Sequence, residues 1–565
     1  MRLKPATDSS AGPAIPPSAG PAIPPSAGPA IPPSAGTAIL PSAESEALST
    51  IIFYLDLSPA PRVSESYCDE EHDLSHANVI NCTNVSNTWH ITQIILRSVP
   101  LDGYISAVVK NLTYLEILDL SNNNLYSSIP PELGSLSHLT YLNLANNKLT
   151  GSIPPSLGNL KNLTILYLYS NQLAELIPSD LGNLKKVETL DLSYNQLTGP
   201  IPERLGNLKM LKTLDFSKNQ LTGAIPSHLG RLEKLETLYL FKNFLNDSIP
   251  PSFGSLSSLE DMDLSFNRLS GSIPGELGKL VKLETLYLRE NELTGSLPKA
   301  LGKLSNLGIL SLSSNYFTGN LPDEYQNIAT MKYFYVAGNY LTGPFPKFVI
   351  KWVNLSSLKP FCIMDAGKLH RCSLATQCTS SGLNTDAACT GVSLLTFQRR
   401  LAGWPDAVSA SRKAMGWPYD NGDLGGNNFE DKLPPEIFTM TNLQTLRVTD
   451  LNHTGFQLPM SINLTNMDTL VLRSCNIIGQ IPSFIFDENT YMSRLDLSFN
   501  NFTGVIPNSI LNLKSSSSMY VITFLDHHQS ISLFSFITRF TDVNWHLWFQ
   551  VSLRRCDQSD NSPLD

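Results

Sequence analysis

Residues Leu139–Leu160 read LTYLNLANNKLTGSIPPSLGNL, and this stretch decides the fold. It holds Leu-x-x-Leu-x-Leu-x-x-Asn, which ends at Asn147, then Leu-x-Gly-x-Ile-Pro and a closing Leu-Gly-Asn-Leu. The pattern recurs with a period of 24 residues and places ten asparagines on one grid: Asn123, Asn147, Asn171, Asn195, Asn219, Asn243, Asn267, Asn291, Asn315 and Asn339. A fixed period of this length indicates a solenoid, in which similar coils stack on one another.

The spacing within one coil has a physical explanation. Leu142 and Leu144 point inward from a short strand, and the residues that alternate with them face the other side. Stacked coils bury these leucines together, while the asparagine at the turn can satisfy backbone groups of its own and adjacent coils. The sequence therefore predicts an α/β-type leucine-rich-repeat solenoid, a right-handed superhelix with a parallel β-sheet on its concave face and short 3-10 or irregular segments on its convex face.

The segments before the array differ from it in composition. Residues 1–46 are rich in Pro, Ala and Ser, with SAGPAIPP repeated three times, and are expected to be disordered. Residues 47–65 are expected to form a linker or the remnant of a signal segment, because their apolar run is separated from the basic start of the chain. Residues 66–100 are expected to form an N-terminal cap with a first irregular coil, and 101–358 the regular repeats.

Two cysteines lie in the expected cap. Cys68 and Cys82 flank an acidic, polar stretch just ahead of the first coil. A solenoid must cover the leucines at its end, and a disulfide between these cysteines would hold a cap that has little core of its own. Two unpaired thiols are the alternative.

The grid of asparagines breaks after Asn339 and resumes at Asn427, with Cys475 in a ladder position and Asn500 in the last one. Removing the 64 residues of 359–422 restores an unbroken repeat, so we predict an insertion there and resumed repeats over 423–513. The insertion could be a ligand-contacting island domain, a loop held by two disulfides, or a retained intron. Its place inside a strand favours the intron, because splitting a strand core disrupts packing. Residues 514–565 form a non-repeat tail.

Composition and motifs exclude several functions. Forty Lys and Arg against 49 Asp and Glu give a net charge of −9, and no basic block suggests a nucleic-acid partner. The longest apolar stretches fall far short of the ~20 residues that cross a bilayer, and no clear signal peptide is found. The chain has no Gly-rich loop with HRD and DFG motifs, so we expect no kinase activity, no catalytic residue, no metal site and no cofactor.

The phrase LTGxIPxxLGxL, at residues 149–160, 197–208 and 221–232, resembles the plant-specific class of repeats in receptor-like kinases and receptor-like proteins. The later stretches 440–451 and 470–482 look like the ectodomains of the receptor kinases that carry a malectin-like domain. The resemblance implies a cell-surface receptor with an extracellular array, a membrane helix and a cytoplasmic serine/threonine kinase. It implies an extracellular peptide, glycan or protein ligand, a possible co-receptor kinase, and an extracellular or plasma-membrane location. The chain departs from this plan, because it shows no malectin-like domain, membrane helix or kinase.

Candidate binding residues are those that the strand pattern places on the concave face. Tyr and Arg are enriched at interface hot spots, although aromatic residues also have a high strand propensity without any partner. The candidates are Tyr141, Tyr167, Tyr169, Tyr194, Lys218, Tyr239, Phe241, Lys242, Phe266, Tyr287, Arg289, Glu290, Tyr333 and Tyr335. The repeated aspartates Asp119, Asp191, Asp215 and Asp263 are interpreted as part of the repeat consensus.

Nine N-x-S/T sequons suit a secreted glycoprotein. They lie at Asn81, Asn84, Asn111, Asn162, Asn246, Asn354, Asn452, Asn463 and Asn501. Two other functions stay open beside the receptor module. One is a secreted inhibitor of cell-wall-degrading hydrolases, similar to polygalacturonase-inhibiting proteins, and the other is a fragment of a gene that encodes a receptor kinase.

Overall fold

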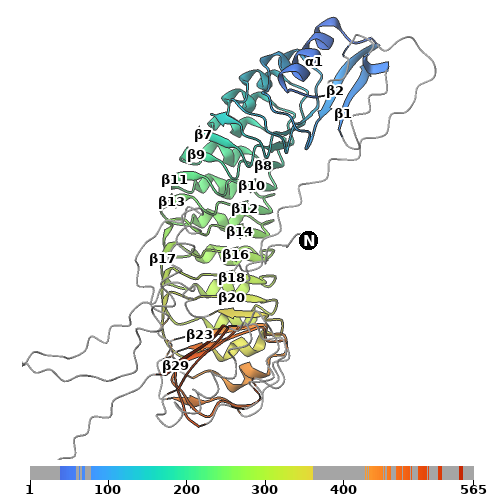
Figure 1. Ribbon diagram of the computed structural model, residues 1–565. Coiled ribbons are helices and arrows are strands. Elements are labelled where there is room, and N and C mark those ends of the chain that lie inside the picture. Colours follow the sequence, from blue (N-terminus) through green and yellow to red (C-terminus); the bar gives the residue numbers. More distant parts are fainter. Residues whose placement is uncertain are drawn as a thin grey trace, which may run out of the picture.

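The computed structural model is a long, curved array of stacked coils (Figure 1). It describes residues 39–58, 63, 67–69, 78–359, 427, 429, 432–449, 451, 455–459, 466–473, 475–483, 485, 494–504, 507, 509, 519–524 and 546–551. The predicted insertion beyond residue 359, most of the tail and residues 1–38 lie outside this part. The predicted leucine-rich-repeat solenoid is confirmed, with a parallel sheet along one face and 3-10 helices along the other.

The main sheet has one short strand in each coil, and neighbouring strands are parallel and in register. The strand leucines Leu142, Leu190 and Leu238 are fully buried, and they belong to one continuous core that runs through the whole array. The strands are β2 (Thr88–Ile95), β3 (Ile117–Asp119), β4 (Tyr141–Asn143), β6 (Ile165–Tyr167), β8 (Thr189–Asp191), β10 (Thr213–Asp215), β12 (Thr237–Tyr239), β14 (Asp261–Asp263), β16 (Thr285–Tyr287), β18 (Ile309–Ser311), β20 (Tyr333–Tyr335), β22 (Ser357–Lys359), β23 (Thr445–Thr449), β25 (Thr469–Arg473), β27 (Arg494–Phe502), β28 (Met519–Phe524) and β29 (His546–Val551).

The opposite, convex face carries one 3-10 helix in most coils. Except for the first, which follows Ser106, each begins after a proline, whose fixed φ suits the start of a helix, and the coils stack closely there. A Cβ on Gly206 would lie 2.3 Å from the carbonyl oxygen of His228 in the next coil, which explains the recurring Leu-Gly pair. These helices are η3 (Ala107–Asn111), η4 (Pro131–Ser135), η5 (Pro155–Asn159), η6 (Ser179–Asn183), η7 (Glu203–Asn207), η8 (Ser227–Arg231), η9 (Pro251–Ser255), η10 (Gly275–Lys279), η11 (Lys299–Lys303), η12 (Asp323–Asn327), η13 (Lys347–Lys351) and η14 (Pro435–Thr439).

A second set of short parallel strands runs along one side of the array, where the Leu-x-Gly part of each repeat lies (Figure 1). Most of these strands pair with their counterparts in adjacent coils. They are β5 (Thr150–Gly151), β7 (Gln172–Leu176), β9 (Gln196–Gly199), β11 (Gln220–Ala224), β13 (Phe244–Asn246), β15 (Ser270–Gly271), β17 (Glu292–Ser296), β19 (Tyr316–Gly319), β21 (Tyr340–Leu341), β24 (Phe456–Gln457) and β26 (Ile477–Gly479).

The N-terminal end is covered by a helix and a hairpin. Helix α1 (Ser42–Tyr54) buries Leu48 and Ile51 in the core, and strand β1 (Val79–Val85) pairs antiparallel with β2. The short helix η1 (Tyr67–Asp69) is joined to β1 by the Cys68–Cys82 disulfide, which confirms the predicted bond.

The structure differs from the sequence analysis at this end, because α1 forms where a disordered tract and a linker were expected. The helix is stabilised by burial against the first coils rather than by its own length. The backbone oxygen of Tyr54 accepts a hydrogen bond of 2.9 Å from the N–H of Tyr104, which fixes the end of the helix on the array.

The coil that contains the predicted insertion keeps its place in the array. Strand β22 pairs with β20 on one side and with β23 on the other, and Ser357 lies opposite Thr445. Asn427 accepts a hydrogen bond from the N–H of Leu341 and donates one to Val336, as the asparagines of the regular coils do. The chain on both sides of the predicted insertion therefore contributes to one coil.

Candidate binding surface

The asparagine ladder has a structural role. The side-chain amide of Asn219 donates to the carbonyl oxygens of Leu192, at 3.0 Å, and Phe216, at 3.2 Å, while its oxygen accepts from the N–H of Leu197 at 3.0 Å. The same contacts recur along the array, and Cys475 uses its thiol to donate to Val448 in the corresponding coil. Because these groups bond one another, the ladder offers little to a ligand.

Three aspartates lie in a column near the centre of the concave face. Asp191, Asp215 and Asp263 each accept a hydrogen bond from the backbone N–H two residues later, at 2.8–2.9 Å. Burial raises the pKa of Asp191 to about 7, with the nearby Asp215 adding to the shift, and raises the pKa values of Asp215 and Asp263 to about 6. These carboxyl groups hold the turn after each strand, and their protonation changes the charge of the face.

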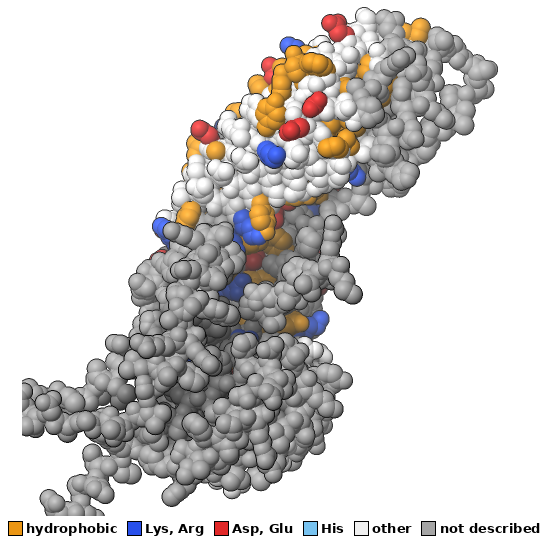
Figure 2. Space-filling view, viewed as in Figure 1, with side chains coloured by type: hydrophobic (Ala, Val, Ile, Leu, Met, Phe, Trp, Pro, Cys, Tyr) orange, Lys and Arg blue, Asp and Glu red, His pale blue; other side chains and the backbone are white. Residues whose placement is uncertain are grey.

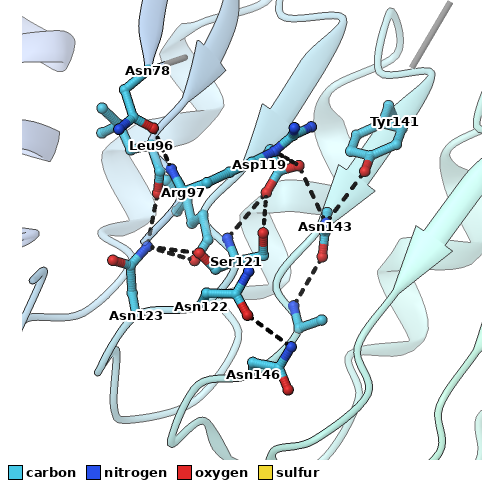
Figure 3. A network of polar contacts seen from close by, with 12 residues as sticks. Asn78, Leu96, Arg97, Asp119, Ser121, Asn122, Asn123, Tyr141, Asn143 and Asn146 are labelled. Carbon is cyan, nitrogen blue, oxygen red and sulfur yellow. Dashed lines mark hydrogen bonds and ion pairs between the residues drawn. The ribbon is translucent and has the colours of Figure 1, made fainter. Parts of the chain in front are cut away.

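A polar network that sequence reasoning missed lies at the N-terminal end of the concave face (Figure 3). Arg97 Nε donates to Asp119 Oδ2 at 2.7 Å, and the amide of Asn143 bridges Asp119 and the hydroxyl of Tyr141 at 3.2 Å each. Asp119 is fully buried. A charged residue at position 97, just after the first repeat-like strand, is the signal in the sequence that could have suggested this partner.

The predicted tyrosines next to this network form a packed cluster. Tyr141 lies edge-on to Tyr167, with ring centroids 6.2 Å apart, and Tyr167 lies edge-on to Tyr169 at 5.8 Å. The rings bury one another, since Tyr141 and Tyr167 keep only 7% and 8% of their surface exposed. Burial raises the pKa of Tyr141 to about 12, so its hydroxyl stays protonated near neutral pH.

A different group of side chains occupies the next coils. We define the central strip as Tyr194, Lys218, Phe241, Lys242, Phe266 and Arg289. Lys218 Nζ lies 3.5 Å from the ring centroid of Tyr194, and Arg289 Cζ lies 4.7 Å from that of Phe266. Basic and hydrophobic side chains also lie next to one another along the middle of the array in Figure 2. Cations held over aromatic faces form an anchored basic surface.

The central strip includes backbone positions that are unusual for its side chains. The residue before the ladder asparagine has a positive φ in successive coils, and Tyr194, Lys218, Lys242, Phe266 and Glu290 have φ values of 53–55°. Other coils place Asn122, Asn146, Ser170, Ser314 or Gly338 there. The left-handed region favours glycine and asparagine, and strained positions of this kind cluster at functional sites. Five consecutive coils therefore carry a bulky residue at this strained position, and this distinguishes them from the other coils.

The other candidate residues lie in separate places on the same face. Tyr239 lies 6.3 Å from Phe241 and Tyr333 lies 6.3 Å from Tyr335, by ring centroids, while Tyr287 lies on β16 and the exposed Glu290 follows Arg289. The aromatic stripe is not continuous, because Asp191 and Asp215 interrupt it in one region and Ser311 in another. The structure thus divides the candidates into the N-terminal tyrosine cluster, the coils of the central strip and a pair on β20.

The sequons in the described residues lie away from the concave strands. Asn81 and Asn84 lie on β1, Asn111 lies on η3, and Asn246 lies on the side strand β13. Asn162 and Asn354 lie in turns between the convex helices and the strands, and Asn501 lies near the end of β27. Asn452 and Asn463 fall outside the described residues.

Within the described part of the chain, no helix has the length and hydrophobicity that a membrane span needs. No group of three or more His, Cys, Asp or Glu side chains in these residues is arranged to hold a metal ion.

Comparison with protein families finds the repeat directly. Residues 192–367 match the description "Leucine-rich repeat region", and residues 113–173 and 137–197 match "Leucine rich repeat". A further single repeat is matched at 491–513, beyond the predicted insertion.

Curated relatives from Arabidopsis thaliana match short parts of the array. A protein described as "Probable LRR receptor-like serine/threonine-protein kinase" is 40% identical over 73 residues, which are 13% of this chain and 7% of the relative. Receptor-like protein 32 is 33% identical over 103 residues, which are 17% of this chain and 12% of the relative. The chain thus matches only a small part of each relative's length.

Solved structures match a larger part. The plant peptide hormone receptor RGFR1 in complex with RGF2 is 26% identical, with a TM-score of 0.53 over 77% of this chain and 66% of that one. A TDR receptor is also 26% identical, with a TM-score of 0.62 over 77% of this chain and 65% of that one. The chain therefore contains leucine-rich repeats, folds as a leucine-rich-repeat solenoid, and has relatives among plant receptor-like kinases and receptor-like proteins.

Proposed function

We propose that this chain is an extracellular recognition module that binds a peptide or protein ligand on its concave face and performs no catalysis. The run of bulky residues at positive φ in the central strip carries the proposal, because consecutive coils keep strained side chains where asparagine or glycine would relax the backbone. The solved peptide hormone receptor and the receptor-like proteins among its relatives support a ligand-binding array.

The covalent features suit an extracellular location. A disulfide joins Cys68 and Cys82, and such bonds persist in oxidising compartments. The sequons in the described residues leave the concave strands free, so glycans attached to them would not cover the central strip. A plasma-membrane receptor kinase of the malectin-containing type, a glycan ligand and a co-receptor kinase are finer parts of this proposal, and they rest on the sequence resemblance.

A glycan introduced on the concave face would test the proposed binding surface. The full chain is produced in a secretory host and used to select binders from a phage-displayed library of random dodecapeptides. Thr237→Asn with Tyr239→Thr creates a sequon on β12, and Lys209→Thr creates a matched sequon at the exposed, convex Asn207.

Peptides selected on the unchanged chain should lose binding to the β12 variant and keep it with the convex variant. Peptides that bind all three proteins equally would contradict the concave location. Failure to select any peptide, together with a stable complex with a fungal pectinase, would favour the hydrolase-inhibitor alternative.

A further inference from the structure

In two neighbouring coils, every second residue from the start of the strand has a short side chain, and these side chains point to the concave face. We define them as the acidic recess: Thr189, Asp191, Ser193, Thr213, Asp215 and Ser217. Tyr167 stands in register with Asp191 on one side of the recess. Tyr239 stands in register with Asp215 on the other side. The two tyrosines are three strand spacings, or roughly 14 Å, apart along the sheet, so two acidic groups lie between aromatic side chains.

The two carboxyl groups of the recess have no cation paired with them. Neither Asp191 nor Asp215 belongs to an ion pair among the described residues. Burial raises the pKa of Asp191 to about 7 and that of Asp215 to about 6, and no paired positive charge offsets this loss of hydration. Asp215 keeps part of its surface exposed, so a ligand can reach the pair.

The lysines at the two ends of the recess have other partners. Lys212, just before β10, forms an ion pair of 2.8 Å with Glu188. Lys218, just after the recess, places its ammonium nitrogen 3.5 Å from the ring centroid of Tyr194. These two cations are therefore already engaged, and a positive charge for the carboxyl groups can come from a ligand.

An aspartate at the same position of an earlier coil has the partners that the recess lacks. Asp119 accepts hydrogen bonds from Arg97 Nε and from the hydroxyl of Ser121, both at 2.7 Å. In the recess, the hydroxyl of Ser217 is buried without a hydrogen-bond partner, and the residue is only 1% exposed. The hydroxyl of Tyr167 is likewise buried without a partner. Because native proteins rarely bury polar groups unpaired, these two hydroxyls indicate that a polar group of a ligand enters the recess.

We propose that the acidic recess binds an arginine side chain of the ligand, with the guanidinium group between Asp191 and Asp215. A guanidinium group has five N–H donors in one plane, so it can donate to carboxyl groups on adjacent strands, which are about 4.8 Å apart. It is less strongly hydrated than the ammonium group of lysine and packs against aromatic rings, which suits a buried place between tyrosines. Its positive charge also favours the ionised form of both carboxyl groups.

The recess adjoins the central strip. Tyr194 and Lys218 of the central strip directly follow Ser193 and Ser217, so the strip and the recess share two coils. A peptide on the concave face can therefore place one arginine in the recess and its neighbouring residues over the central strip. The arginine recess rests on the proposed function and specifies one chemical group that the ligand presents.

Two peptides that differ only in the charged group provide the test. The probes are the pentapeptide Ala-Ala-Arg-Ala-Ala and its counterpart with citrulline in place of arginine, both acetylated and amidated at their ends. Citrulline has the shape of arginine and no charge. Saturation-transfer NMR titrations against the full chain should show binding of the arginine peptide that is tighter by on the order of tenfold or more, because hydrogen bonds to charged groups are stronger than neutral ones.

Variants of the recess then locate the site. Asp191→Asn with Asp215→Asn removes both charges and keeps the side-chain shape, so this double variant should bind the two peptides equally. Ser217→Phe should also abolish the preference, because it fills the recess and keeps both carboxyl groups. Phe241 occupies the equivalent position of the next coil, so the fold accepts a phenylalanine there. Asp263→Asn removes the same charge at the same position outside the recess and should leave the preference unchanged.

Equal affinity of the unchanged chain for the two peptides would overturn the arginine recess, and so would a preference that persists in the folded double variant. If the double variant does not fold, Ser217→Phe decides the matter. A melting temperature that rises with calcium chloride in the unchanged chain, and not in the double variant, would assign the carboxyl groups to a metal ion instead.

Failure of the arginine recess can be told apart from failure of the proposed function. Library peptides that are lost on the β12 glycan variant, yet bind equally well when citrulline replaces each of their arginines, would keep the concave site and refute the arginine recess. Library peptides that bind the glycan variant normally would contradict the concave site itself.

Discussion

Asp191 and Asp215 lie directly opposite each other on the neighbouring strands β8 and β10. Each oxygen Oδ1 accepts a backbone N–H at 2.9 Å, from Ser193 and Ser217 respectively, so both side chains are fixed in place. Two carboxyl groups on adjacent strands that are buried together resist ionisation, because desolvation and mutual repulsion both disfavour the charged forms. The pair gives this part of the concave face a charge that depends on pH.

The pair should make the protein less stable as the pH rises from about 4 to about 7. Burial raises the pKa values of Asp191 and Asp215 to about 7 and about 6, above the ordinary value of 3.8 for an aspartate, so the folded state binds protons more tightly than the unfolded state. The stabilisation is complete below the unfolded pKa and is lost as the pH rises through the folded values.

Asp191→Asn should remove a pH dependence on the order of 1–3 kcal/mol. Asn143 occupies the equivalent position two coils earlier and still accepts the N–H of Ala145, so the turn should survive the change. The measurement is the melting temperature of both proteins at pH 4.5 and pH 7.5, with Asp102→Asn at an exposed position as a control. Equal pH dependence in the Asp191 variant and the unchanged protein would contradict the assignment.

The Cys68–Cys82 disulfide should stabilise the N-terminal cap. The bond closes a loop with a sequence separation of 14 residues, and a loop of this size is worth about 3 kcal/mol. Cys68→Ser with Cys82→Ser should lower the melting temperature and raise amide exchange in α1 and β1 more than in the central coils. A reducing agent should reproduce the effect in the unchanged protein and have no further effect on the double variant. Uniform exchange along the array would argue against a local role.

The sequence predicted the repeated parts of this structure because every coil makes the same contacts. A leucine at a fixed spacing must be buried between coils, and an asparagine at the turn must satisfy the same backbone groups. Helix α1 was missed because Leu48 and Ile51 become a helical face only when the first coils bury them. The partner of Asp119 was missed for a similar reason, because Arg97 comes from the irregular first coil, outside the grid.

The sequence could predict which side chains lie on the concave face, but it could not predict which of them contact one another. Alternation along a strand indicates which side chains point away from the core, and the candidate residues of the concave face were chosen in this way. It does not tell that Tyr141 and Tyr167 bury each other, since that depends on which residues occupy the same position in adjacent coils. The positive φ before each ladder asparagine is likewise a property of the folded turn.

Loss of one ladder asparagine should destabilise the array strongly. Asn219→Ala would leave the N–H of Leu197 and the carbonyl oxygen of Leu192 without their partner in a buried place, at about 1–3 kcal/mol each. Asn219→Cys should be milder, because Cys475 fills such a position in this chain. Chemical denaturation of the variants compares them with Gln220→Ala on the exposed neighbour, which should stay within about 0.5 kcal/mol of the unchanged protein. Equal stability of the Ala variant and this control would show that the ladder bonds contribute little.

At the positive-φ positions of the central strip, a substitution that relieves backbone strain should raise stability and weaken peptide binding. Lys242 has a φ of 54° and an exposed side chain, and its ammonium nitrogen lies 5.4 Å from the ring centroid of Phe266. Lys242→Asn should relieve backbone strain of about 1 kcal/mol, because asparagine tolerates the left-handed region. It also removes one positive charge of the central strip. We therefore expect a melting temperature equal to or above that of the unchanged protein together with weaker peptide binding.

Asn146→Lys provides the reverse experiment at the same position of another coil. Asn146 has a φ of 54° and donates from its side-chain amide to Asn122 at 2.9 Å, so a lysine there should lower stability without improving binding. Thermal melts and peptide anisotropy on both variants separate the two effects, because strain acts on folding in either coil while the ligand meets only the central strip. If Lys242→Asn destabilises the fold as much as Asn146→Lys does, the lysine is held there by packing, and the positive-φ run loses its value as a marker of the binding site.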